Sequence, residues 1–95
     1  PDAVLVHEGE RVIEASGPLG RLLARPAHTL VGERLADLVV PADRARVVAH
    51  LAEGDETPIE ASLVADAGAA AVPCELHPRT LVADGGVARL VVVRD

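Results

Sequence analysis

The sequence predicts a single α+β domain in which a five-stranded antiparallel sheet has helices packed on one face. The predicted helices form one block that follows two strands and precedes three more, so alternating βαβ units are not expected. The last segment, residues 86–94, is an apolar run in which Arg89 is the only charged residue before Arg94. Such a run is typical of a strand covered on both faces in the middle of a sheet. A chain of 95 residues is long enough for one such domain and its core.

The chain opens with a predicted β-hairpin. Residues 3–7 and 11–15 are rich in aliphatic and β-branched side chains, and the tight turn Glu8-Gly9-Glu10 separates them. Ser16 follows the second strand and can cap a short helix that has Pro18 in its first turn. Residues 27–33 are expected to form a loop after that helix.

The longest helix is predicted over residues 41–53, with Gly54 at its end. Asp43 lies in the first turn, where its carboxylate is expected to cap the helix or interact with the helix dipole. One or two helical turns are expected over residues 35–39. Two strands are then predicted over residues 57–66 and 70–82, because apolar side chains alternate along them, as at Val72, Cys74 and Leu76.

Two prolines in the fourth predicted strand constrain the sheet. Pro73 and Pro78 have no N–H to donate to a neighbouring strand. We therefore expect the neighbouring strand to be missing, or a bulge to occur, at each of these positions.

The composition excludes several classes of function. The formal net charge is −6 and the chain has no aromatic residue, which argues against a nucleic-acid partner. No segment is apolar over the length needed to span a bilayer, so no membrane contact by this segment is expected. The single Cys74 excludes an internal disulfide and fits a reducing, cytoplasmic location.

Four stretches, in order and over nearly the whole chain, resemble the PAS domain family. They are the opening hairpin with Ser16 at its end, residues 19–25, residues 30–45 and the final residues 93–95. The resemblance implies that the first and last strands lie side by side at the centre of the sheet. It also implies a sensory or dimerisation module that controls an output domain, such as a bacterial histidine kinase, a cyclase, a phosphatase or a transcription regulator. Because the chain begins at Pro1, we expect residues 1–95 to be one PAS-like domain of a larger signalling protein.

The residues that hold cofactors in some PAS domains are not matched here. Flavin-binding members carry a cysteine in the helical half, whereas residues 22–32 contain none and Cys74 lies in a strand. Haem-binding members use a histidine of the long helix, but the corresponding position here is nearer Val47 than His50. Neither flavin nor haem is therefore expected, and Cys74 is interpreted as a small core residue.

No metal site or catalytic set is apparent in the sequence. The histidines show no paired spacing typical of metal ligands, and no Ser-His-Asp order, phosphate loop or carboxylate pair occurs. The four histidines are His7, His28, His50 and His77. We therefore expect a binding or regulatory part rather than an enzyme.

Two functions remain open at this point. In one, the domain dimerises and relays a signal without a ligand; in the other, it is a sensor that binds a small, mostly apolar ligand between helices and sheet. The candidate cavity residues are Leu22, Val31, Leu35, Leu38, Val47, Leu51, Leu63, Cys74 and Leu90. The simpler interpretation is that these side chains fill the core, because few polar groups are available inside to orient a ligand.

The outer face of the sheet is the candidate homodimer interface. A domain of this size has no second layer to cover that face, and exposed apolar patches often mark partner sites. The candidate interface residues are Val4, Val6, Val87, Val91 and Val93. The alternation along the last strand leaves a second possibility open, in which Ala88, Leu90 and Val92 face outward instead.

Overall fold

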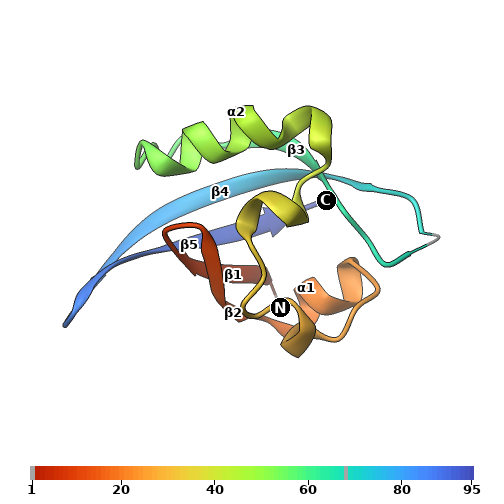
Figure 1. The fold of residues 1–95 in the computed structure, drawn as a ribbon, viewed down its shortest axis with the longest axis horizontal. Coiled ribbons are helices and arrows are strands. Elements are labelled where there is room, and N and C mark those ends of the chain that lie inside the picture. Colours follow the sequence, from red (N-terminus) through yellow and green to blue (C-terminus); the bar gives the residue numbers. More distant parts are fainter. Residues whose placement is uncertain (1, 68) are drawn as a thin grey trace.

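The computed structural model describes residues 2–67 and 69–95, which form a five-stranded antiparallel sheet with helices on one face (Figure 1). The strand order is β2-β1-β5-β4-β3. In chain order the elements are β1 (Ala3–Glu8), β2 (Arg11–Ala15), α1 (Gly17–Leu22), the 3₁₀ helices η1 (Ala27–Thr29) and η2 (Leu35–Leu38), α2 (Pro41–Ala52), β3 (Ile59–Leu63), β4 (Val72–Ala83) and β5 (Gly86–Arg94). This arrangement confirms the predicted fold class.

The last strand is at the centre of the sheet, as its two apolar faces indicate. β5 pairs with β1 on one side and with β4 on the other, and both pairings are antiparallel. Val91 of β5, for example, lies between Leu5 of β1 and Pro78 of β4. The first and last strands are therefore neighbours, which brings the two ends of the chain together.

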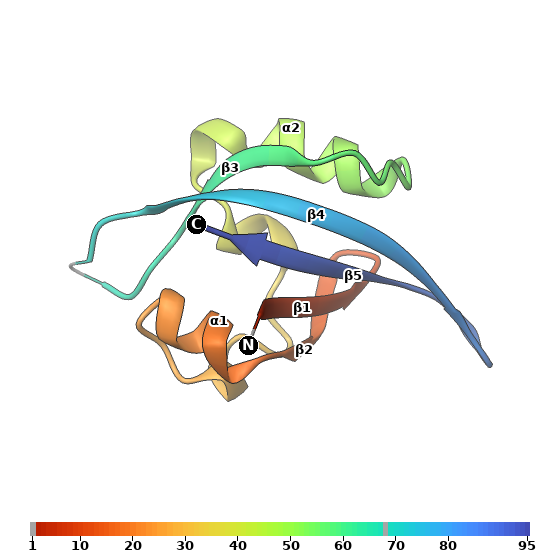
Figure 2. The same cartoon turned by 180° about the vertical axis from the view of Figure 1, so that it is seen from behind.

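The helices cover one face of the sheet, and the view from behind shows the other face of β4 and β5 (Figures 1 and 2). The core lies between the two layers and consists of leucine, valine, alanine and Cys74 side chains. In β5 the odd-numbered positions face this core, because Val91 and Val93 are 1% and 4% exposed. The even-numbered residues Leu90 and Val92 are half-buried on the opposite face.

Ser16 joins the opening hairpin to the first helix. Its Oγ accepts a hydrogen bond from the Leu19 N–H at 3.3 Å, which caps α1 as predicted. The same oxygen accepts from the Val4 N–H at 2.9 Å. One hydroxyl therefore fixes the helix start against β1.

Of the two roles predicted for Asp43, the structure supports the interaction with the helix dipole, because Asp43 lies in the first turn of α2 and is not its N-cap. Val40 is the N-cap residue and supplies no side-chain bond. The Asp43 carboxylate instead accepts from the Ser62 N–H of β3 at 3.0 Å, and this bond lowers the pKa of Asp43. Asp43 thus ties the first turn of α2 to the edge strand, while Gly54, with φ +73°, follows the helix end as predicted.

Both prolines of β4 lie where one neighbouring strand is missing, as predicted. The pairing of β3 with β4 stops at Leu76, so Pro78 has only β5 beside it. The pairing of β4 with β5 stops at Glu75, so Pro73 has only β3 beside it. None of the helices in the described part of the chain is long and apolar enough to cross a bilayer.

Candidate functional site

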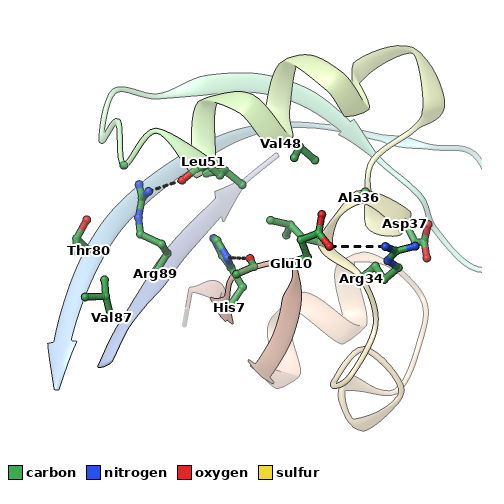
Figure 3. Close-up of a pocket in the computed structure, with 14 residues that line it drawn as sticks. His7, Glu10, Arg34, Ala36, Asp37, Val48, Leu51, Thr80, Val87 and Arg89 are labelled. Carbon is green, nitrogen blue, oxygen red and sulfur yellow. Dashed lines mark hydrogen bonds and ion pairs between the residues drawn. The ribbon is translucent and has the colours of Figure 1, made fainter. Parts of the chain in front are cut away.

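A cleft of about 630 Å³ opens between the second half of α2 and the inner face of the sheet (Figure 3). Its walls come from η2 and α2, its floor from β1 and β5, and one end from the turn between β1 and β2. The lining residues are His7, Gly9, Glu10, Arg34, Leu35, Ala36, Asp37, Val48, Leu51, Ala52, Gly54, Thr80, Val87 and Arg89. Its volume lies in the range of small-molecule sites.

The floor of the cleft is polar and buried. His7 of β1 and Arg89 of β5 are cross-strand partners, and their side chains are 4% and 7% exposed. Both residues occupy positions on the helix-facing side of their strands, where the other inward positions of β5, Val91 and Val93, are apolar. A cross-strand pair of this kind places the two side chains next to each other.

Arg89 holds the end of α2. Its Nη1 donates to the Leu51 carbonyl at 2.6 Å (Figure 3), and its Nη2 donates to the Asp55 carbonyl at 3.0 Å. The Leu51 carbonyl lies in the last turn of α2, at the negative end of the helix dipole, which favours a cation. The Nε of Arg89 is buried and has no hydrogen-bond partner among the described residues.

His7 presents a fixed hydrogen-bond acceptor. Its Nδ1 lies 3.0 Å from the Gly9 carbonyl, and because a carbonyl only accepts, Nδ1 must carry the proton. In the neutral ring Nε2 is then an acceptor, and this atom is buried without a partner in the described part of the chain. Burial lowers the pKa of His7; the bond to Gly9 opposes this effect, and the charge of Arg89 adds to it.

This lowered pKa leads to a prediction. Unfolded chains bind a proton near the ordinary histidine pKa of 6.5, whereas folded His7 binds it less readily because its pKa is lower. The free energy of unfolding therefore decreases as the pH falls through 6.5 toward the lower pKa of the folded state. The decrease is at most about 1.4 kcal/mol per pH unit. We expect chemical denaturation between about pH 7.5 and 5.5 to show this slope in the wild type but not in His7→Phe.

The matched control is His28→Phe, because His28 is exposed. It should keep the wild-type slope. The carboxyls with lowered pKa, Asp43 and Asp55, act at more acidic pH and do not interfere. A His7→Phe variant with an unchanged slope would show that His7 is not buried as a neutral ring.

The rim of the cleft is charged and its walls are apolar. Glu10 and Arg34 form an ion pair of 3.6 Å across one end, with both side chains more than half exposed. Val48 and Leu51 of α2 and Leu35 of η2 supply apolar surface. A ligand in this cleft would thus meet apolar walls and a charged rim.

The predicted cavity residues mostly fill the core instead of lining the cleft. The leucines and valines enclose a void of only about 10 Å³, and Leu35, Leu38, Val47, Leu51 and Leu63 are among the residues that line it. Leu22 packs against the core from its margin, and Cys74 belongs to the buried cluster. Leu35 and Leu51 also reach the cleft.

Two of the predicted cavity residues lie elsewhere. Val31 is 46% exposed, because it follows the buried Leu30 at the end of η1 and points away from the core. Leu90 is on the outer face of the sheet, because the inward positions of β5 are the odd-numbered ones. Neither residue lines the cleft.

The interface prediction was wrong for part of β5. Val91 and Val93 are buried under the helices, so they are not available on the outer face. Val87 is 60% exposed but belongs to the same inward-facing side, beyond the end of α2, and it lines the cleft.

Val4 and Val6 are half-buried on the outer face, opposite Val92 and Leu90. The alternative set Ala88, Leu90 and Val92 is therefore the outward one.

Cys74 and His50 are placed away from the cleft. The Cys74 thiol donates to the Val72 carbonyl at 3.3 Å, and burial, with a smaller effect from Asp95, raises its pKa to about 11. Such a thiol is not activated for covalent chemistry. His50 contacts the Thr57 carbonyl at 2.7 Å.

Among the described residues no cluster of three or more His, Cys, Asp or Glu could hold a metal.

The comparisons with known proteins identify the fold. No family model matches the sequence, and no curated protein matches it. Among solved structures, a PAS domain from Desulfitobacterium hafniense is similar with a TM-score of 0.82 and 15% identity, over 99% of this chain and 92% of that one. The PAS domain of an HTR-like protein from Haloarcula marismortui is similar with a TM-score of 0.85 and 17% identity, over 100% of this chain and 81% of that one. A third structure, the PAS domain of a two-component sensor histidine kinase, has a TM-score of 0.81 and 14% identity, over 98% of this chain and 83% of that one.

This chain has the PAS fold. The resemblance found in the sequence is thereby confirmed at the level of architecture, including the central pair formed by β1 and β5. A light-oxygen-voltage domain is similar as well, with a TM-score of 0.76 and 17% identity. Sequence reasoning located the PAS fold but missed the cleft, since His7 and Arg89 lie 82 positions apart and become neighbours only through the pairing of β1 with β5.

Proposed function

We propose that this chain is a sensory module of a signal-transduction protein, which binds a small molecule in the cleft beneath α2 and passes its presence to an output domain. The observation that carries the proposal is the cleft itself. It has a volume of about 630 Å³, apolar walls from Leu35, Val48 and Leu51, and the charged residues Glu10 and Arg34 at its rim. A concave, largely apolar site with a few charged groups at its mouth is suited to a small molecule.

The PAS fold supports the signalling part of this proposal. One similar structure is the PAS domain of a two-component sensor histidine kinase, and another is a domain of a sensory box sensor histidine kinase/response regulator from Geobacter sulfurreducens. We infer that the present domain also acts beside an output domain and has no catalytic activity of its own. Flavin and haem are not the ligands we expect, because Cys74 lies in strand β4 and not in the helical half of the chain, and because His50 does not line the cleft.

Native mass spectrometry of the purified chain tests the sensing function. We expect a small molecule to be retained and released on unfolding, and we expect no absorption band in the visible range. A chain that is always free of ligand, and that shows no binding from a metabolite extract, would favour the relay without a ligand.

We further propose that the outer face of the sheet forms a homodimer. Val4 and Val6 of β1 lie opposite Val92 and Leu90 of β5, which makes one continuous apolar patch of half-buried side chains. Glu14 of β2 flanks this patch beside Val6. On the other side Arg79 of β4 pairs with Leu90. A second copy related by a two-fold axis can therefore place opposite charges at both margins of an apolar centre.

Sedimentation velocity at micromolar concentration is expected to show a dimer, and Leu90→Arg is expected to convert it to a folded monomer. Each copy brings one arginine to the shared patch, so two like charges would repel each other and lose their water at the contact. The matched control is Val82→Arg, at the 81% exposed tip of the β4–β5 hairpin. It should leave the mass unchanged. A monomeric wild type would refute the homodimer.

A further inference from the structure

The polar side chains of the cleft floor are engaged within the protein. The two Nη atoms of Arg89 donate to the carbonyls of Leu51 and Asp55. His7 Nδ1 donates to the Gly9 carbonyl at 3.0 Å. The remaining nitrogens, Arg89 Nε and His7 Nε2, are buried beneath the cleft surface, out of reach of a molecule in the cleft. The floor therefore gives a ligand little to bind by hydrogen bonds.

The walls of the cleft are aliphatic. The large apolar side chains that line it are Leu35, Val48, Leu51 and Val87. Small residues line it as well and leave room between these side chains; they are Gly9, Ala36, Ala52 and Gly54. Aliphatic ligand surface gains free energy against such walls without any hydrogen bond. The chain has no aromatic residue on which a flat ring could stack.

The charges at the rim do not select a charged ligand. Glu10 and Asp37 are acidic, Arg34 is basic, and all three are exposed. Arg34 pairs with Glu10 at 3.6 Å. Exposed charges interact weakly through water, whereas a charged group that enters an aliphatic cleft loses its hydration. The rim therefore disfavours an anion, and it offers a cation too little to offset the cost of desolvation.

We propose that the cleft binds an uncharged aliphatic molecule, which packs against Val48 and Leu51 of α2. The proposal rests on the sensing function proposed above and specifies its ligand class. A cleft of about 630 Å³ is large enough to enclose a molecule of roughly ten non-hydrogen atoms. A neutral hydroxyl group is far less costly to remove from water than a charge, so an aliphatic alcohol belongs to this class.

Isothermal titration of the purified chain with five matched probes tests the ligand class. The probes 1-hexanol, 1-heptanol and 1-octanol differ only in length, and octanoate and octylammonium replace the hydroxyl end of 1-octanol by a charged end. We expect the affinity to rise about fourfold for each added methylene, as the burial of one more aliphatic group predicts. Octanoate and octylammonium should each bind about tenfold more weakly than 1-octanol, because each brings a hydrated charge into the cleft.

Two alanines of α2 supply a matched pair of variants. Ala52 and Ala49 are both exposed, but only Ala52 lines the cleft. Ala52→Leu puts a larger side chain at the cleft wall, so 1-octanol should bind about tenfold more weakly, because the ligand loses space. Ala49→Leu places the same side chain outside the cleft and should bind 1-octanol as the wild type does. Circular dichroism should show that both variants are folded.

The outcomes separate the ligand class from the sensing function. If octanoate or octylammonium binds the wild type more tightly than 1-octanol, and Ala52→Leu weakens that binding, the class is wrong while binding in the cleft stands. If Ala52→Leu binds 1-octanol as tightly as the wild type, the alcohol binds elsewhere and the proposal is refuted. If no probe binds but native mass spectrometry finds a retained molecule, the class is wrong and the sensing function stands. If neither is found, both are refuted.

Discussion

Replacing Leu51 by Asp is expected to unfold the domain. Leu51 is 3% exposed and lies on α2 between the core and the cleft. An aspartate there would bury a carboxylate among aliphatic side chains at a loss of about 4 kcal/mol or more, which is a large part of the 5–15 kcal/mol typical of a small domain. Circular dichroism and chemical denaturation of the variant should show little or no cooperative unfolding transition.

The control for this prediction is Ala45→Asp on the same helix. Ala45 is exposed, so the same new charge stays in water and the loss should remain below about 1 kcal/mol. A Leu51→Asp variant that unfolds at nearly the wild-type denaturant concentration would mean that α2 does not pack on the sheet through this face.

The second large effect distinguishes two adjacent residues of β5. Val91→Arg should abolish folding, because Val91 is 1% exposed and lies between β1 and β4 under the helices. Leu90→Arg should fold, because Leu90 is on the opposite, half-buried face. The difference in the free energy of unfolding between the two variants should exceed about 3 kcal/mol, measured by denaturation in guanidinium chloride.

This pair of variants tests the orientation of the whole sheet. A strand that slips by one position, or presents its other face to the helices, exchanges the environments of all its side chains. A folded Val91→Arg and an unfolded Leu90→Arg would therefore reverse the assignment of the core and outer faces. Equal losses in both variants would indicate that both faces of β5 are buried in the isolated chain.

The architecture was predictable because its strongest signals are local. The apolar run of β5 could only belong to a central strand, and Ser16, Gly54 and the two prolines of β4 fix where helices begin, end and lose strand neighbours. Which face of β5 packs against the helices was not predictable. Leu90 and Val92 are as apolar as Val91 and Val93, so hydrophobicity does not say which set is covered by the helices.

Arg89 is the residue that makes sequence reasoning fail here. A charged residue within an apolar strand is expected to point to water, yet Arg89 points inward because the carbonyls at the end of α2 accept its hydrogens. Residues two apart in a strand share a face, so an inward Arg89 would have placed Val91 and Val93 on the inward face of β5 as well. The candidate site was missed for the same reason, since its floor depends on the pairing of His7 with Arg89 across the first and last strands.

Hydrogen exchange of the chain with and without its retained ligand tests the central claim most directly. The chain as purified is compared with the same chain after unfolding, removal of small molecules and refolding. The account predicts slower exchange in the ligand-bound chain at the last turns of α2 and around His7 and Arg89, with no difference in α1 or β3, which do not line the cleft. Identical exchange in both preparations, or protection confined to elements that do not line the cleft, would contradict a ligand site in the cleft.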